Sequence, residues 1–141
     1  ANIVPKYTKS SNCTTAAALQ FSLTKLEIEN IIILGHSCCA GIAALCELGH
    51  KEPQNNVESW LAQIRNEKQL PLHKYPEHIK NDIDKKALYS ALQSRENLLS
   101  YPWVTTAIKQ RNLKLHAWFI DIEAMQLYEY ESETNEFRVF S

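Results

Sequence analysis

The most apolar stretch of the chain is Ile31–Leu34, in which four consecutive residues are large and aliphatic. Because successive side chains of a strand point to opposite faces, this run predicts a strand buried on both faces, as in the middle of a parallel sheet covered by helices. Gly35 ends the run. A helix of small and apolar residues is predicted over Ala40–Leu48, with Gly49 as its stop signal.

Apolar residues recur at helical spacing in four other segments, and three more segments have the composition of strands. The predicted helices are Ala16–Leu26, which Thr14 or Thr15 can cap, Val57–Ile64, Ile79–Leu99 and Trp103–Lys109. The predicted strands are Leu113–Ile122, Gln126–Glu131 and Phe137–Phe140. Residues Asn2–Asn12 are predicted to form a loop. Together these elements predict an α/β fold with a mostly parallel central sheet flanked by helices.

Composition and charge narrow the class of protein. A chain of 141 residues suits a single domain, 1–141, and its 45% hydrophobic and 22% charged residues are typical of a folded globular protein. The formal net charge of -1 argues against a nucleic-acid-binding face. No apolar run approaches the ~18 residues of a membrane span, so no membrane partner is expected. The chain shows no signal peptide and begins without Met, which suggests removal of an N-terminal piece.

The cysteines are not spaced like a disulfide framework; they are Cys13, Cys38, Cys39 and Cys46. Cys38 and Cys39 are adjacent and could bond to each other only with strain. We therefore expect free thiols in a reducing compartment, the cytoplasm. Cys46 lies two helical turns after Cys39 and is expected to pack in the core.

The one dense group of reactive side chains lies in Gly35–Cys39, directly after the aliphatic strand. In open α/β sheets, ligands bind at this carboxyl end of a strand. His36 and Cys39 are three residues apart across a turn, so an imidazole nitrogen and a thiolate sulfur could converge on one Zn²⁺ ion. A zinc site would need at least one more ligand from elsewhere in the chain.

Two other interpretations of the same run stay open. Gly35–Cys39 resembles the Gly-x-Ser-x-Gly elbow of serine hydrolases, with Ser37 as the nucleophile, except that Cys39 stands where the elbow has glycine. In the structural alternative, Gly35 permits the turn, His36 forms a hydrogen bond and the cysteines pack in the core. His116, in the middle of a predicted strand, is expected to be a hydrogen-bonded structural residue.

Several segments, in the same order, resemble the β-class carbonic anhydrases. Gly-His-Ser-x-Cys at 35–39, after an apolar strand, is similar to the zinc-binding segment of that family. Further matches are Asn-Ile-Val-Pro at Asn2–Pro5, the helix Ala16–Leu26, the Pro-containing stretch Asn97–Val104 and the strand Leu115–Ile122 with its Leu-His-Ala-Trp start. Because these matches span nearly the whole chain, the resemblance is more specific than any single motif.

The resemblance implies that His36 and Cys39 are zinc ligands. The third ligand of the family is a cysteine in an upstream Cys-x-Asp-x-Arg motif, which this sequence lacks. Cys13 is not followed by Asp-x-Arg and is not assigned. We therefore expect a β-carbonic anhydrase-like fold that lacks its first strand, in a chain without its N-terminal segment. No catalytic residue and no residue binding another cofactor is assigned.

The implied activity is that of a lyase, in which zinc-bound hydroxide reversibly hydrates carbon dioxide to bicarbonate. With one ligand missing, the chain is expected to bind zinc weakly and to be impaired as an enzyme. Its Ile31–Leu34 strand is expected to keep one unpaired edge, and the family resemblance implies a homodimer or a higher homo-oligomer. The alternative function is a non-catalytic truncated family member that acts as an assembly or binding module. A serine hydrolase that uses Ser37 is a weaker alternative.

Overall fold

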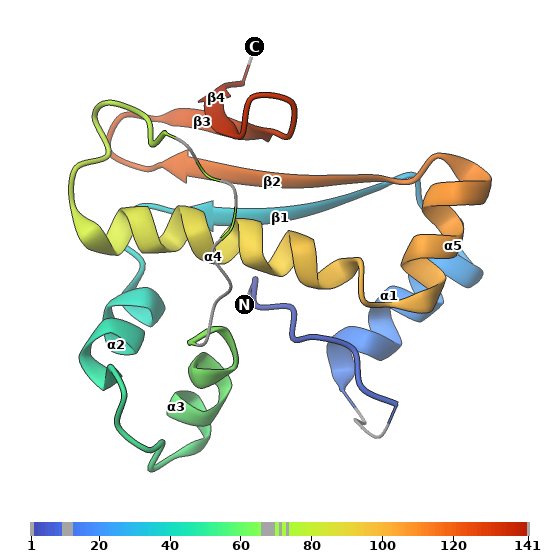
Figure 1. Ribbon diagram of the computed structural model, residues 1–141, viewed down its shortest axis with the longest axis horizontal. Coiled ribbons are helices and arrows are strands. Elements are labelled where there is room, and N and C mark those ends of the chain that lie inside the picture. Colours follow the sequence, from blue (N-terminus) through green and yellow to red (C-terminus); the bar gives the residue numbers. More distant parts are fainter. Residues whose placement is uncertain (1, 10–12, 66–69, 71, 73, 141) are drawn as a thin grey trace.

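The centre of the molecule is a mixed sheet (Figure 1). The computed structural model describes residues 2–9, 13–65, 70, 72 and 74–140. Within these residues the sheet contains, in spatial order, β1 (Asn30–His36), β2 (Lys114–Asp121), β3 (Gln126–Glu131) and β4 (Glu136–Val139). β1 and β2 are parallel, whereas β3 is antiparallel to both of its neighbours.

The predicted α/β class is confirmed, but the prediction of a mostly parallel sheet holds only for β1 and β2. Residues 122–125 connect β2 to β3, and residues 132–135 connect β3 to β4. A parallel crossover needs about a dozen residues or more, so connections this short can only return the chain as antiparallel hairpins. The long stretch between β1 and β2 contains helices and can make the parallel crossover.

The helices of the described chain agree with the predicted ones in number and place. They are α1 (Thr14–Thr24), α2 (Ala40–Leu48), α3 (Asn56–Leu61) with the 3₁₀ turn Ala62–Ile64, α4 (Asp82–Leu98) and α5 (Pro102–Arg111). α4 begins later than the predicted Ile79 because the Asn81 side chain caps it and accepts the Asp84 N–H. None of the described helices is both long enough and apolar enough to cross a membrane.

α4 packs along one face of β1 and β2. Ile33, Ala117 and Phe119 lie on this face and are buried. Gly35 pairs with Phe119 in the sheet and faces α4. A Cβ atom added at Gly35 would lie 3.3 Å from the Ala87 carbonyl oxygen of α4 and 3.3 Å from Phe119 Cδ2. The missing side chain at this position therefore sets how near α4 lies to the end of β1.

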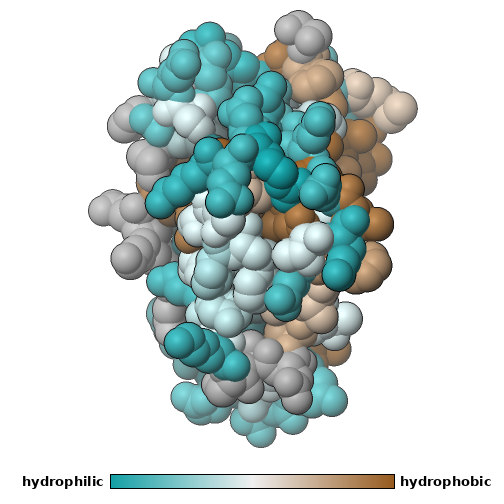
Figure 2. All heavy atoms as spheres, turned by 90° about the vertical axis from the view of Figure 1, so that its right-hand side faces the viewer, coloured by the Kyte–Doolittle hydropathy of each residue, from teal (hydrophilic) through white to brown (hydrophobic). Residues whose placement is uncertain are grey.

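The other face of β1 is open to solvent, so the prediction of a strand buried on both faces is wrong for this chain. Ile32 is 45% exposed and Leu34 is 48% exposed. β1 pairs only with β2 and forms one edge of the described sheet, which confirms the predicted unpaired edge. Figure 2 shows hydrophobic surface gathered along one side of the molecule. An unbroken aliphatic run indicates that both faces favour burial, but it does not say which polypeptide covers the second face.

Residues 2–9 are irregular, as predicted, yet their apolar side chains belong to the core. Ile3 is 4% exposed and Val4 is 5% exposed. The Val4 N–H donates to Ser94 Oγ (3.1 Å), and the Val4 carbonyl accepts from Asn97 Nδ2 (2.8 Å). Two polar side chains of α4 thus satisfy buried backbone groups that have no strand partner.

We expect Gly35→Ala to lower the free energy of unfolding by about 1–3 kcal/mol, because the new methyl group would push α4 away from β1. Gly41→Ala is the matched control, since a Cβ atom there would have its nearest neighbours at 3.8 Å. As Gly41 lies in α2, its replacement should be neutral or stabilise the protein by up to about 1 kcal/mol. Urea denaturation followed by circular dichroism measures both. Equal stability of the two variants would contradict the packing argument.

Candidate functional site

His36 and Cys39 line one small cavity at the carboxyl end of β1. His36 is the last residue of β1, and Cys39 is the N-cap of α2. The cavity has a volume of about 130 Å³, and its other lining residues are Asn2, Leu34, Gly35, Ile42 and Ala87. The fold thus brings together the two side chains that the sequence singled out as metal ligands.

A backbone hydrogen bond orients the His36 ring. Its Nδ1 lies 2.8 Å from the Ser37 carbonyl oxygen. Because a carbonyl oxygen can only accept, Nδ1 must carry the proton in this contact. In the neutral imidazole the lone pair is then on Nε2, which is the state that a metal ligand requires.

The turn between His36 and Cys39 is tied to two other elements. The Ser37 N–H donates to the Ile120 carbonyl (3.0 Å), and Ser37 Oγ accepts the Ile122 N–H (2.9 Å), so Ser37 is fixed to the end of β2. Cys38 has a φ of 55°, in the left-handed region that side chains with a Cβ atom disfavour. Contacts outside the turn therefore have to maintain its conformation.

The hydrogen bonds of Ser37 argue against the serine-hydrolase alternative. The residue is 3% exposed, and its Oγ is used as an acceptor for a backbone N–H of the neighbouring segment. The imidazole beside it, His36, directs Nδ1 to the Ser37 backbone carbonyl and not to Oγ. A nucleophilic serine needs an exposed hydroxyl bonded to a base. The geometry gives Ser37 a role in holding the turn.

The other cysteines lie outside this cavity. Cys38 is exposed, as is Cys46, so the prediction that Cys46 packs in the core is wrong. Cys46 is on the solvent side of α2, whose buried residues are Ile42, Leu45 and Leu48. Cys13 lines a different cavity beside Trp60. The spacing of seven residues from Cys39 did not fix whether Cys46 faces the core or the solvent. The packing of α2 against the rest of the protein decides this.

The described residues offer a metal two donors at this place. No group of three or more His, Cys, Asp or Glu side chains that could hold a metal ion occurs within the described ranges. A tetrahedral zinc site takes three or four protein ligands. His36 and Cys39 fit zinc by donor type, and the set lacks its third protein ligand.

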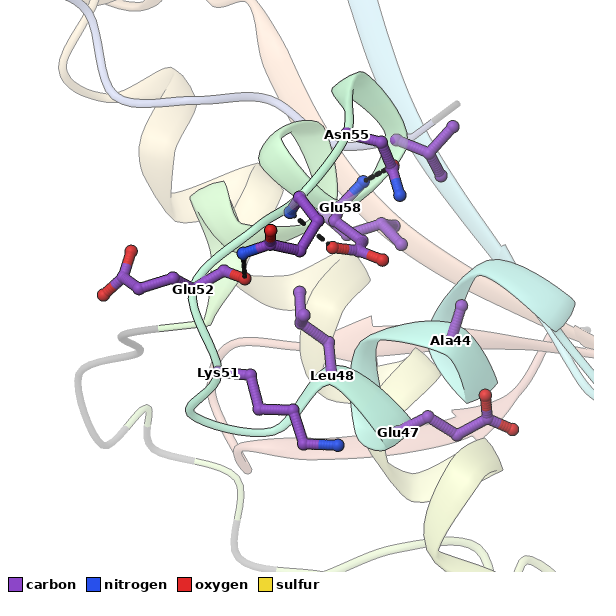
Figure 3. Close-up of a pocket in the computed structure, with 10 residues that line it drawn as sticks. Ala44, Glu47, Leu48, Lys51, Glu52, Asn55 and Glu58 are labelled. Carbon is purple, nitrogen blue, oxygen red and sulfur yellow. Dashed lines mark hydrogen bonds between the residues drawn. The ribbon is translucent and has the colours of Figure 1, made fainter.

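A cavity of about 630 Å³ lies between α2 and α3 and is lined by neither predicted ligand (Figure 3). Two of its polar side chains, Asn55 and Glu58, form hydrogen bonds at the start of α3. Asn55 Oδ1 accepts the Glu58 N–H (2.9 Å), and Glu58 Oε2 accepts the Gln54 N–H (2.7 Å). These contacts form a helix cap, and the cavity is not the candidate site.

Two histidines hold together strands and loops away from the cavity. His116 Nδ1 lies 2.6 Å from Glu129 Oε1, and its Nε2 lies 3.0 Å from Asn30 Oδ1, so the ring links three strands. This confirms the prediction of a hydrogen-bonded structural histidine. His78 Nε2 lies 3.1 Å from Asp121 Oδ2, a pair that the sequence analysis did not anticipate.

Asp84, which no sequence signal singled out, contacts the turn from 46 residues away. Asp84 Oδ1 accepts the Cys38 N–H at 2.7 Å. The Asn81-x-x-Asp84 spacing resembles a helix-capping box and could have predicted where α4 starts. It carries no signal of the contact with Cys38, because that contact depends on the packing of α4 against β1.

The comparisons with known proteins agree on one family. The family model described as carbonic anhydrase matches residues 1–127. Beta carbonic anhydrase 5, chloroplastic, of Arabidopsis thaliana is 32% identical over 124 residues, which are 84% of this chain and 40% of that protein. A carbonic anhydrase of Synechocystis is 30% identical over 139 residues, or 96% of this chain and 50% of that protein.

Solved structures give the same result. The β-carbonic anhydrase CcaA superposes with a TM-score of 0.77 and 28% identity over 99% of this chain and 63% of that one. A tetrameric β-carbonic anhydrase of Sordaria macrospora has a TM-score of 0.68 at 21% identity, over 90% of this chain and 62% of that one, and supports the fold alone. The chain belongs to the β-class carbonic anhydrase family. It spans about half the length, or less, of these curated relatives.

The contact between His116 and Glu129 predicts a dependence of stability on pH. Burial disfavours the carboxylate, but the interactions with the side chains of His116 and Trp118 and the charge of His116 together outweigh it and lower the pKa of Glu129. A lowered pKa stabilises the folded protein above the unfolded carboxyl pKa, and this contribution is lost as the pH falls through the folded value.

We therefore expect Glu129→Gln to reduce the free energy of unfolding near pH 6. The difference from the wild type should shrink as the pH falls below about 4. Urea denaturation at a series of pH values measures this. Glu123→Gln, at an exposed residue, is the control and should show no such trend. A difference that stays constant down to low pH would contradict the assignment.

Proposed function

We propose that this chain is part of a zinc-dependent carbonic anhydrase that interconverts carbon dioxide and bicarbonate, with His36 and Cys39 as two of the metal ligands. The observation that carries the proposal is the shared cavity at the end of β1, which both side chains line in a member of the β-class family. Imidazole nitrogen and thiolate sulfur are preferred zinc donors.

The surroundings of both donors suit a metal. The Nδ1 contact with the Ser37 carbonyl leaves His36 Nε2 free to coordinate. Cys39 lies at the N-terminus of α2, and the positive end of a helix dipole is a favourable place for negatively charged groups. Zinc held there would supply the Lewis acidity that makes water nucleophilic near neutral pH. The third ligand would be the cysteine that the family resemblance puts in a Cys-x-Asp-x-Arg motif.

The walls of the cavity suit a small apolar substrate. Leu34, Ile42 and Ala87 contribute apolar surface beside the two donors. Carbon dioxide has no net dipole, and apolar walls favour it over water while polar groups at one end fix its orientation. In this arrangement the chain's own residues contribute the binding of the substrate and the exclusion of water, and His36 and Cys39 contribute the binding of the metal.

We expect the 141-residue chain alone to retain much less than one zinc per chain after dialysis and to hydrate carbon dioxide slowly, because its described residues offer the metal two donors. His36→Ala and Cys39→Ser should each remove the residual zinc. Cys38→Ser is the matched control and should leave it unchanged, since Cys38 lies outside the cavity. Metal analysis and stopped-flow hydration measure these effects. Loss of zinc only in Cys38→Ser, or unchanged zinc in both His36→Ala and Cys39→Ser, would contradict the ligand assignment. Robust turnover by the chain alone would contradict the expected impairment.

The same metal analysis distinguishes the carbonic anhydrase from the alternative function. The missing third donor also fits a non-catalytic family member that serves as an assembly or binding module. That alternative expects no specific zinc and no change on replacing His36 or Cys39. Under both proposals, residues 1–141 form a single domain.

We propose that the chain assembles as a homodimer or a higher homo-oligomer. The half-exposed Ile32 and Leu34 on an edge strand support this, and the relative from Sordaria macrospora is described as tetrameric. The four free cysteines, of which Cys38 and Cys46 are exposed, support a reducing compartment such as the cytoplasm.

We expect Ile32→Lys to shift the chain toward monomer, because it puts a charge on the open face of the sheet. Val57→Lys is the control: Val57 is 67% exposed but lies on α3, away from the sheet. Analytical ultracentrifugation at several concentrations measures the mass. A wild type that stays monomeric at all concentrations, or equal effects of both variants, would contradict the proposal.

A further inference from the structure

We propose that Asp84 is a positioning residue for the candidate metal centre, because its carboxylate clamps the turn that joins His36 to Cys39. The inference rests on the proposed function, in which these two side chains bind zinc. Asp84 does not line the cavity and would not touch the metal. It would act through the backbone of Cys38, which lies between the two ligands.

The Asp84 carboxylate uses both of its oxygens. Oδ1 accepts the Cys38 N–H at 2.7 Å, and Oδ2 accepts from Asn81 Nδ2 at 2.6 Å. The Asp84 N–H in turn donates to Asn81 Oδ1 at 2.8 Å. Asn81 therefore holds the carboxylate in one rotamer, and the carboxylate holds the turn.

The burial of Asp84 points to a role beyond starting a helix. The residue is 5% exposed, and uncharged donors bind it. Burying a carboxylate is costly unless specific hydrogen bonds repay the lost hydration. Asp82 lies in the same first turn of α4, and its side chain is 98% exposed. The favourable interaction of an acidic residue with the start of the helix is therefore available without burying a carboxylate.

The contact falls where the turn needs it. Cys38 has a positive φ of 55°, which its Cβ atom disfavours. Ser37, the residue before Cys38, is hydrogen-bonded to the end of β2. The Asp84 hydrogen bond then ties Cys38 itself to α4. With the bond removed, Cys38 could relax to a right-handed conformation, which would rotate Cys39 relative to His36.

Asparagine cannot replace this carboxylate. In the Asp84→Asn variant the side chain has a single amide oxygen, and if that oxygen faced Cys38, the new NH₂ group would face the NH₂ group of Asn81. The substitution therefore preserves size and removes one acceptor. Asp82→Asn removes the same charge from the same helical turn and is the matched control.

The experiment measures binding of Co²⁺ as the probe metal, by the thiolate-to-cobalt absorption of the 141-residue chain and of each variant. We expect Asp84→Asn to bind Co²⁺ roughly tenfold more weakly, as for other residues that orient ligands, and Asp82→Asn to bind like the wild type. Urea denaturation on the same samples shows whether the loss exceeds any change in stability. Asn81→Gly is a second variant, for the case that Asp84→Asn fails to fold, because glycine is nearly as good a helix cap.

Asn81→Gly frees Asp84 Oδ2 and should also weaken Co²⁺ binding, by a smaller factor than Asp84→Asn. Wild-type affinity in a folded Asp84→Asn or Asn81→Gly variant would overturn the positioning role. An equal loss in Asp82→Asn would overturn it too, since the effect would then come from helix charge. Because two donors are expected to bind weakly, Co²⁺ is titrated up to the highest concentration at which the chain stays folded. If no thiolate-to-cobalt absorption develops in the wild type even there, the proposed function fails, and the role of Asp84 fails with it.

Discussion

The close approach of α4 to the end of β1 is the contact on which the rest of the structure depends. It is possible because Gly35 has no side chain in the space between β1, Phe119 and the Ala87 carbonyl. The same approach buries Ile33 and Ala117, and it brings the first turn of α4 beside the residues that follow β1. One packing distance thus couples the core to the candidate metal centre.

The candidate centre is built from parts that are distant in the sequence. The turn 36–39 is held by β2 through Ser37 and by α4 through Asp84. The N-terminal segment contributes Asn2, whose side chain donates to the Leu34 carbonyl at 2.9 Å and lines the cavity. Because β2, α4 and the N-terminal segment fix the turn from outside, the residues of the turn do not have to encode its conformation themselves.

Two unsatisfied features meet at the same edge of the molecule. β1 has one free edge and an open face, and the cavity at its end has, among the described residues, two metal donors without a third. A neighbouring strand with a further thiolate would satisfy both, because it would pair with β1 and bring a ligand to the cavity. The chain spans 40% of the Arabidopsis thaliana relative and 50% of the Synechocystis relative.

The sequence by itself determined the elements, their order and the family, and it singled out His36 and Cys39 as candidate donors, because periodicity, caps and a motif are local signals. It did not determine the sheet directions after β2, the exposed side of Cys46 or the open face of β1. Only the tertiary structure decided these and the contact of Asp84 with Cys38, since each depends on which distant surfaces pack together, and no local pattern encodes that.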